Sequence, residues 1–591
     1  MINSDKEYLV NLIAGEKKNW EEPYERGLDR GKDIDIVKSR FLREKNLRSE
    51  VDLRLERVKE NAITWRTIMG LASIEDQVEG HKYLYSFGER TGVYIDAIMV
   101  IPNILTGVPK EKREGLPKGT SFVLSEPKDW AALSQAAPIQ PAFCDFQLGS
   151  PNSAENTYNS IKNGTSYLGV FAQFSWDYPG CNDDYEHISS IIEALGMAAS
   201  KRNDKVVVDT YLDDGIASYF LDMASYLGYA RLEKYIISDL CKARYACSFG
   251  QLMDKIIPKM SLWLALSDVL KEEDQPGVSY IFSNCIDHWD HDLEANYGVL
   301  CSEVLIEVLI EKKYKTGISI LPIPITEKVA VPTPEAIANI HAAARRVEEK
   351  SDEWESLIDF DVIEKTRDVL KESGLKFFEN ILEGLEAAGV DINNPLEMLM
   401  ILKRVNPSML EKLFHPSTYN TDLDTVDPKV PTSMAKRSLD EKDAIIENVK
   451  DTDNIYALKD KRVLVASGDA HWYGMFVVGE VLSGIGMDVS DGGVGLDPVD
   501  LLDLADEEGL EIITISVHNG QALDYAKQLV QLSEIRGKKY YIFMGGKLNG
   551  IIGNDSEPTD VTQYIEELGI NTSDTVEELV NKLLKVDPIR G

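Results

Sequence analysis

Cysteine is scarce in this sequence, and its few cysteines are not paired by spacing. The chain has 6 cysteines among 591 residues, with no Cys-x-x-Cys pair and none beyond residue 301. Closely spaced cysteines are the usual sign of a zinc cluster, and cysteine-rich small domains rely on disulfides. The pattern favours reduced, mostly buried thiols in a cytosolic protein.

Long apolar runs are also missing. No stretch of eighteen apolar residues occurs, and residues 1–27 are charged and have no apolar core. A membrane-spanning helix needs about 20 consecutive, mostly apolar residues, and a signal peptide needs an apolar core. We therefore expect a cytoplasmic protein that has no membrane partner.

Positive charge is scarce relative to negative charge. The chain has 63 Lys and Arg against 99 Asp and Glu, which gives a formal net charge of −36 at pH 7. Nucleic acids and anionic membrane surfaces are bound by clusters of Lys and Arg. The composition argues against both of these partners, and a small molecule is the expected ligand.

The chain is too long for one hydrophobic core and alternates between strand-like and helix-like segments. Residues 1–60 are charged and have apolar residues at helical spacing, which predicts a helical extension. Over residues 61–345, apolar runs such as "KVVVDTYL" and "TGISILPIPI" alternate with helical stretches. Such alternation over about 285 residues favours a TIM-like (β/α)8 barrel over an open sheet. Its active site would lie at the C-terminal ends of the strands.

The rest of the chain predicts a helical segment and a smaller α/β domain. Residues 346–455 are helical and end in a linker that carries three prolines within 415–434. Over residues 456–591 the alternation restarts, which predicts a doubly wound, flavodoxin-like (Rossmann-like) domain. Such domains bind ligands at the carboxyl ends of their strands. Three polar, glycine-bearing loops fall at these ends: 469–474, 516–520 and 545–550.

The first of these loops, "DAHWYG", has the residue types of a metal ligand and its orienting partner. Asp469 precedes His471 by two residues, and Gly474 follows it by three. An imidazole can ligate a metal through one nitrogen while a carboxylate accepts the N–H of the other. A surface loop with an incidental histidine is the alternative. The other two loops add polar and glycine residues at neighbouring strand ends: Ser516, His518, Gly545 and Gly546.

Together the three loops resemble the cobalamin-binding domain of adenosylcobalamin-dependent mutases and of methionine synthase. The pattern of that domain is Asp-x-His-x-x-Gly, then Ser-x-Leu, then Gly-Gly. The resemblance implies that His471 is the lower axial ligand to the cobalt of cobalamin, and that Asp469 holds its other ring nitrogen. It also implies that Gly474 leaves room for the displaced nucleotide tail, and that three further residues contact this tail: Ser516, Gly545 and Gly546.

One position departs from this family pattern. His518 stands where the family has the leucine of Ser-x-Leu. The packing or the hydrogen bonding around the nucleotide tail must therefore differ. His518 is either a second polar contact to the cofactor or a partly exposed neutral histidine.

Residues 66–344 resemble, more diffusely, the catalytic chain of glutamate mutase, here fused to its cobalamin-binding chain. The likeness is clearest in "YIDAI", "GSPNS" and "EKVAVPTPEA". It implies that Glu327 holds the adenosyl ribose of adenosylcobalamin and that Arg66, at the expected end of the first strand, lies near the cofactor. A helix-start carboxylate and a solvated surface arginine are the respective alternatives.

The substrate site departs from that of glutamate mutase. Val100 and either Gln147 or Ala142 stand where the relative has arginines, and no arginine occurs between Arg113 and Arg202. Bidentate recognition of a carboxylate needs a guanidinium, so we expect a substrate other than glutamate. The barrel offers neutral and aromatic groups instead, and three are our candidate substrate contacts: Gln147, Tyr178 and His288.

His288 lies in the stretch "DHWDHD", which has several readings. It could contact the substrate or a proton in transfer, or form a solvated loop. His288 and His291 at i, i+3 could also share a metal ion.

The resemblance implies an adenosylcobalamin-dependent radical mutase, an isomerase of carbon skeletons. Among family members, 2-methyleneglutarate mutase has a comparable fused arrangement, so 2-methyleneglutarate or a less polar compound is the expected substrate. The alternative is a corrinoid methyl-group carrier or methyltransferase component, and a third possibility is a barrel that has lost catalysis. Because related mutases form dimers around the barrel, we expect a homodimer.

Overall fold

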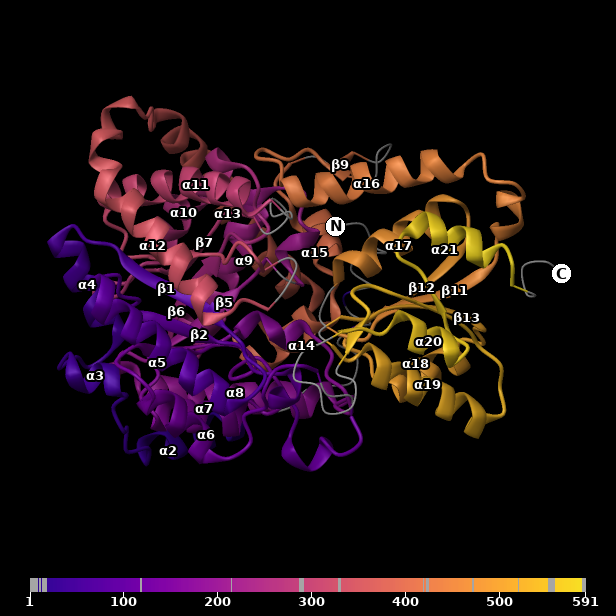
Figure 1. Cartoon of the computed structure of the whole chain (residues 1–591), viewed down its shortest axis with the longest axis horizontal. Helices are drawn as coiled ribbons and strands as arrows, with labels where there is room; N and C mark the ends of the chain where they lie inside the picture. Colours follow the sequence, from indigo (N-terminus) through magenta and orange to yellow (C-terminus); the bar gives the residue numbers. More distant parts are fainter. Residues whose placement is uncertain are drawn as a thin grey trace. The chain divides into compact units, whose positions relative to one another are not determined.

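The computed structural model describes residues 9, 12, 19–116, 119–213, 215–285, 292–327, 331–417, 419–420, 425–469, 472–518, 520–550 and 559–586. The chain forms two compact units (Figure 1). The first comprises Met1–Pro102, Phe122–Ser175 and Asp183–Met434. The second comprises Asn103–Ser121, Trp176–Asn182 and Ala435–Gly591.

The first unit contains a closed barrel of eight parallel strands in sequence order. Strand β1 pairs with both β2 and β8, which closes the barrel. Apart from one partly exposed residue each in β1 and β5, all strand residues are buried, as expected of strands covered on both faces. The (β/α)8 prediction is therefore confirmed. The strands are β1 Thr64–Met69, β2 Ala97–Val100, β3 Gln140–Phe143, β4 Tyr167–Leu168, β5 Val207–Tyr211, β6 Arg244–Phe249, β7 Val278–Ser283 and β8 Ser319–Pro322.

Several helices of this unit begin at polar capping residues. The side chains of Asn394 and Asn406 accept backbone N–H groups at the starts of α14 and α15, and a proline follows each cap. The helices are α2 Glu21–Lys32, α3 Arg40–Glu44, α4 Glu50–Glu60, α5 Ile74–Thr91, α6 Pro127–Gln135, α7 Ser153–Lys162, α8 Asp184–Ser200, α9 Met223–Lys234, α10 Ile256–Leu270, α11 Leu293–Tyr314, α12 Pro334–Lys350, α13 Asp361–Ala388, α14 Pro395–Arg404 and α15 Pro407–Phe414.

Helix α4 is tied to the amino-terminal ends of the barrel strands. Its Arg54 is fully buried and donates to the carbonyl of Gly317, 2.6 Å away, just before β8. The same guanidinium donates to the carbonyl of Val278 and to the hydroxyl of Tyr167, which begin β7 and β4. One arginine thus satisfies polar groups of three strands at the end opposite to the βα loops.

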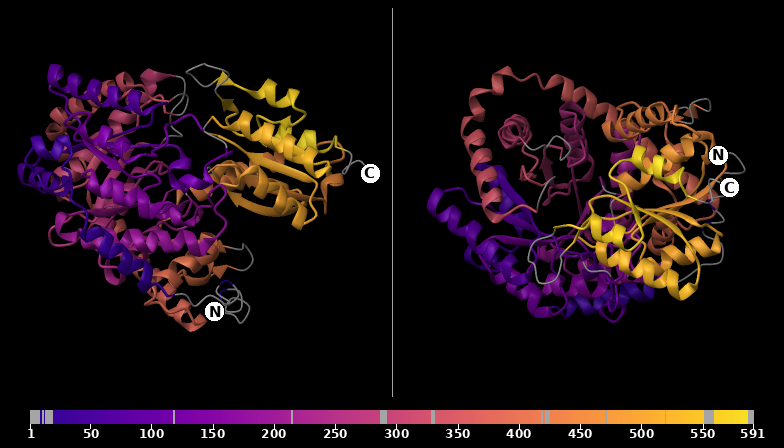
Figure 2. Two further views of the ribbon diagram at one scale, coloured as in Figure 1. Left: turned by 90° about the horizontal axis from the view of Figure 1, so that it is seen from below. Right: turned by 45° about the vertical axis from the view of Figure 1, so that its right-hand side comes forward.

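The second unit is built on a five-stranded parallel sheet in the order β12-β11-β13-β14-β17. Helices cover both faces of this sheet (Figures 1 and 2). Along β11, Val463 and Val465 belong to one apolar core and Leu464 and Ala466 to the other, as the period of two requires. The doubly wound prediction is confirmed. The strands are β11 Arg462–Ser467, β12 Asp488–Val494, β13 Ile512–Ser516, β14 Tyr541–Gly545 and β17 Asn571–Thr572.

The helices of the second unit are α16 Ser433–Val449, α17 Trp472–Gly484, α18 Pro498–Glu507, α19 Ala522–Arg536, α20 Thr562–Glu567 and α21 Val576–Leu583. All of α16 comes from residues that the sequence places in the helical and linker segment, 346–455. The carboxy-terminal part of the second unit therefore begins at Ala435, earlier along the chain than the predicted domain 456–591.

Two further findings concern the chain as a whole. All six cysteines lie in the described ranges, none of them forms a disulfide, and four of them are buried. Within these ranges, no helix has both the length and the apolar character needed to cross a membrane.

Candidate cofactor-binding site

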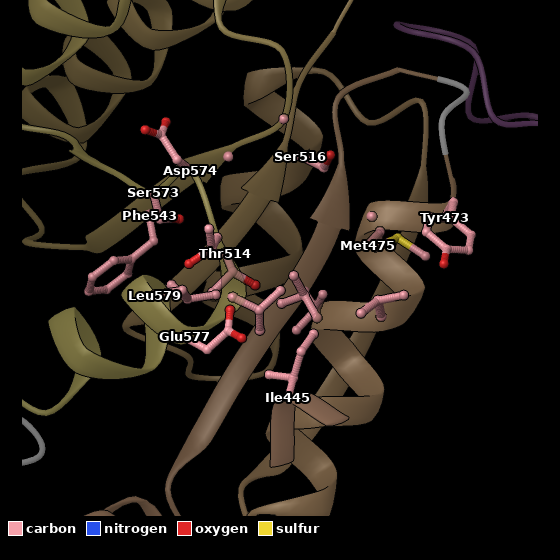
Figure 3. A pocket seen from close by; sticks show the side chains of 18 of the residues that line it. Ile445, Tyr473, Met475, Thr514, Ser516, Phe543, Ser573, Asp574, Glu577 and Leu579 are labelled. Atoms are coloured by element: carbon pink, nitrogen blue, oxygen red, sulfur yellow. The ribbon is translucent and has the colours of Figure 1, made fainter. Parts of the chain in front are cut away.

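A cavity of about 490 Å³ lies in the second unit, at the carboxyl ends of β11, β13 and β14 (Figure 3). Small-molecule sites commonly span about 300–1,000 Å³, so the cavity has the size of a ligand site. Its walls come from this face of the sheet and from helices α16, α17 and α21. Its lining is mostly apolar, with residues such as Ile445, Val465, Val477, Ile515, Phe543 and Leu579.

Five of the residues predicted from the three loops line this one cavity: Gly474, Ser516, His518, Gly545 and Gly546. Ser516 and Gly545 end β13 and β14 and are partners in the strand register. Gly474 lies near the start of α17, where an added Cβ would stand 3.4 Å from the Ser516 Oγ. The sheet therefore brings together loops that are about 30 to 70 residues apart, as parallel strand ends do.

Gly546 adopts a backbone conformation that excludes other residues. Its φ is +101°, and an added Cβ would lie 2.6 Å from the carbonyl oxygen of Val517 and 2.8 Å from the His518 Cε1. Both the positive φ and the close approach need glycine. Gly546 is thus the condition for packing the loop after β14 against the loop after β13.

Asp469 is fixed in the carboxyl edge of the sheet. Its side chain is buried and accepts the backbone N–H of His518, and its carbonyl accepts the N–H of Gly495 at 3.0 Å. Its Oδ2 lies 3.8 Å from the Nδ1 of His518, whose side chain is 26% exposed. His518 is therefore both a lining residue of the cavity and a neighbour of the predicted orienting carboxylate. His471 lies outside the described residues, so its pairing with Asp469 stays a prediction.

The sequence analysis missed the wall that α16 and α17 form. The hydroxyl of Tyr473 donates to the carboxylate of Glu441, and both residues line the cavity. Burial, followed by this hydrogen bond, raises the pKa of Tyr473 to about 12, so the phenol stays a donor at neutral pH. The available signal was helical spacing, because the residues of α16 that line the cavity share one face: Glu441, Ala444, Ile445 and Asn448.

In the first unit, Arg66 lies inside β1, three residues before its end, and not at the strand end that the sequence suggests. Its side chain is fully buried, forms an ion pair with Glu50 of α4, and stacks over the rings of Tyr167 and Tyr280 at 5.0 and 4.7 Å. Burial disfavours the cation, but the charge of Glu50 together with those of neighbouring ionisable groups such as Asp209 outweighs it and raises the pKa of Arg66. Its charge is thus engaged within the barrel, and a role beside the cofactor stays a prediction.

The other barrel candidates occupy different surroundings. Gln147 is buried, and its amide oxygen accepts from the Trp130 Nε1 at 2.9 Å and the Ser160 Oγ at 3.0 Å. Tyr178 is buried within the second unit. Glu327 follows β8, half-buried, with its backbone N–H donating to the carbonyl of Pro324. His288 and the neighbouring His291 lie outside the described residues, and the substrate roles of all these candidates stay predictions.

Two segments that follow barrel strands in the chain belong to the second unit. Asn103–Ser121 comes shortly after β2, and Trp176–Asn182 shortly after β4. In the latter, the N–H of Gly180 donates to Asp497 at 3.1 Å and the amide of Asn182 donates to Asp500 at 2.9 Å. These contacts hold the segment against the loop after β12 and the start of α18.

Comparison with known proteins agrees with this geometry. A family model described as the B12 binding domain matches residues 460–559, a range that contains all seven predicted loop residues. On this match, residues 460–559 are a B12-binding domain. A search of curated proteins finds no match.

Solved structures also show weak similarity to this chain. The methanol:cobalamin methyltransferase complex MtaBC from Methanosarcina barkeri is 14% identical, with 39% of this chain and 75% of that chain covered and a TM-score of 0.19. A novel cobalamin-binding protein from Desulfitobacterium hafniense DCB-2 is 15% identical, with 50% and 98% covered and a TM-score of 0.18. At these scores neither structure supports a functional argument.

Proposed function

We propose that the chain is an adenosylcobalamin-dependent radical mutase, an isomerase that rearranges the carbon skeleton of a small substrate other than glutamate. The observation that carries the proposal is the presence, in one chain, of a B12-binding domain and a closed eight-stranded barrel, with two segments of the barrel region belonging to the cobalamin-binding unit.

The cavity residues fit a cobalamin that is bound through a protein histidine. The space left by Gly474 beside Ser516, and the mostly apolar walls, suit an aromatic nucleotide tail displaced from the cobalt. We propose that His471 ligates the cobalt and that Asp469, held at the sheet edge, fixes the tautomer of this histidine. When bound, adenosylcobalamin supplies a cobalt–carbon bond whose homolysis initiates radical chemistry, while the protein provides binding and orientation.

The segment Trp176–Asn182 favours a mutase over a methyl carrier. An added Cβ at Gly495 would lie 2.3 Å from the carbonyl oxygen of Asp177, so the backbones of the two loops are in direct contact. A methyl carrier has to present its corrinoid to different partners in turn, which requires an accessible domain. Segments held at the carboxyl edge suit a mutase, which must exclude water from the reacting groups.

The distribution of arginines limits the substrate. No arginine occurs between Arg113 and Arg202, and Arg66 is already paired with Glu50. Strands β3 and β4 and their loops therefore lack the guanidinium that binds a carboxylate in a bidentate manner. 2-Methyleneglutarate is itself a dicarboxylate and would need other cations, such as lysines, to bind it. We propose this compound or a less polar one as substrate. We also propose a homodimer, which sedimentation velocity would distinguish from a monomer.

The first test is to add candidate substrates to the protein with adenosylcobalamin, without oxygen, and to record visible absorption and electron paramagnetic resonance spectra. We expect a radical signal that depends on one substrate, with superhyperfine splitting from a protein imidazole nitrogen. The splitting should be lost in His471→Ala and kept in His518→Ala, the control at the second histidine. Preference for methylcobalamin, with methyl transfer and no radical signal, would identify a carrier instead.

A further inference from the structure

Two walls of the cavity come from outside the matched B12-binding domain. The family match ends at residue 559 and begins at residue 460. Helix α16 precedes this range and α21 follows it. Both helices line the cavity, α16 with Glu441, Ala444, Ile445 and Asn448, and α21 with Val576, Glu577 and Leu579. These two walls therefore lie outside the residues that the family model matches.

Helix α16 closes the inner end of the cavity with an apolar residue. Ile445 is 7% exposed and belongs to the same apolar core as Val465, Phe543 and Leu579. Figure 3 shows Ser516 at one end of the cavity and Ile445 at the other, with Thr514 between them. A ligand that enters at the strand ends would therefore meet Ile445 with its innermost part.

Two polar links hold α16 in place. The hydroxyl of Tyr473 on α17 donates to Glu441, and the side-chain amide of Asn448 donates to Glu577 of α21 at 3.3 Å. The guanidinium of Arg437 also lies over the ring of Tyr473, 5.7 Å from its centre. The wall is thus joined to a helix on each side of it, which limits how far it can yield to a larger ligand.

The charges of the lining indicate which part of a ligand goes inside. Among the described residues that line the cavity there are three carboxylates, Glu441, Asp574 and Glu577, and no lysine or arginine. A phosphate group would be repelled by these carboxylates and would find no cation. A neutral aromatic base, by contrast, suits the apolar inner end.

We infer that α16 makes the cavity selective for corrinoids by their lower base, with Ile445 limiting the size of the base and the Glu441–Tyr473 and Asn448–Glu577 links holding the wall. The inference rests on the proposed placement of the nucleotide tail in this cavity. It identifies residues outside the range matched by the family model that determine which corrinoid the protein accepts.

The test compares adenosylcobalamin with adenosylcobinamide, which lacks the nucleotide tail. Ile445→Trp should fill the inner end and weaken adenosylcobalamin binding by about tenfold or more, as overpacking of a site does. Binding of adenosylcobinamide should stay within about twofold. The matched control is Asp443→Trp, because Asp443 lies on the opposite, solvent-exposed side of α16 with 74% of its side chain exposed. Dissociation constants would be measured by absorption titration.

The outcomes separate this inference from the proposed function. If Ile445→Trp leaves the affinity for adenosylcobalamin unchanged, or weakens both corrinoids equally, the selectivity inference is wrong. If the unmodified protein binds neither corrinoid, the proposed function fails as well. Should Ile445→Trp not fold, as judged by circular dichroism, the exposed variant Glu441→Ala carries the test. It should release adenosylcobalamin faster and leave adenosylcobinamide unaffected, and equal release rates would overturn the inference.

Discussion

Single residues at the cavity are set by space as much as by chemistry. Gly546 needs to be glycine because of its φ of +101° and its contacts with Val517 and His518. Asp469 also fixes a neighbouring loop, because its carboxylate accepts the backbone N–H of His518 in the loop after β13. At this scale, a substitution acts by moving a loop rather than by removing a functional group.

The glycine requirement can be separated into its two causes. We expect Gly546→Ala to destabilise the second unit by about 2 kcal/mol more than Gly569→Ala, because only the former adds a steric clash. Gly569 has a similar φ of +87° but no atom within 4 Å of an added Cβ, so it measures the conformational cost alone. Urea unfolding would give both values, and equal losses of stability would show that the loops yield to the added methyl group.

At the scale of elements, the barrel helices bury several carboxyl groups. Glu233 of α9 is fully buried, and its Oε2 accepts the hydroxyl of Tyr245 of β6 at 3.0 Å. Burial, only partly opposed by these hydrogen bonds, raises the pKa of Glu233 to about 8. The pKa of Glu311 of α11 is raised to about 7, also mainly by burial. In the folded protein, Glu233 and Glu311 therefore stay protonated at pH values where the same side chains are ionised in the unfolded chain.

This arrangement predicts a stability that falls as pH rises. Between the ordinary pKa of 4.5 and about 8, the folded state keeps the proton of Glu233 while the unfolded state releases it. The contribution is fully present below pH 4.5 and is lost by about pH 8. Glu233→Gln should flatten the profile and stabilise the barrel unit at pH 8 by roughly 1–3 kcal/mol. Denaturant titrations at pH 5 and pH 8 would give the free energy of unfolding of both proteins. The same change in this free energy between the two pH values in the variant and the unmodified protein would contradict the prediction.

At the scale of the whole molecule, the chain passes between its two units more than once. Segments Asn103–Ser121 and Trp176–Asn182 join the second unit although they lie between barrel strands in the sequence. Two glycines allow this packing. At Gly495, an added Cβ would lie 2.3 Å from the carbonyl oxygen of Asp177. At Gly520, it would lie 2.0 Å from the Cγ2 of Thr120. The cobalamin-binding unit is therefore built from three separate parts of the chain.

Releasing one of these segments should be measurable. We expect Gly495→Ala to raise amide hydrogen exchange across residues 176–182 by about tenfold or more, because the methyl group would push the segment away. Gly509→Ala is the matched control, since Gly509 has a φ of +68° and nothing within 4 Å of an added Cβ. Equal exchange in the two variants would mean that the segment is held by other contacts.

Much of the fold and part of the site could be predicted from local patterns. The alternation of apolar strands with helices predicted both the barrel and the doubly wound domain, and the three loops predicted residues that line one cavity, among them Ser516 and Gly546. Arg66 was placed at a strand end because the length of β1 could not be read from "TWRTIM". The α16 wall was missed because a helix in a charged, proline-bounded stretch gives no sign of what its apolar face covers.

The sequence by itself thus determined the two α/β architectures and the loops that meet at the carboxyl edge of the second sheet. It could do so because strand and helix periodicity and glycine-bearing loops are local signals, and because parallel strands bring their ends together. Only the tertiary structure decided that Glu50 takes up the charge of Arg66, that α16 and α21 complete the cavity, and that two barrel segments join the cobalamin-binding unit. Those outcomes depend on packing between residues far apart in the chain, where no local pattern specifies the partner.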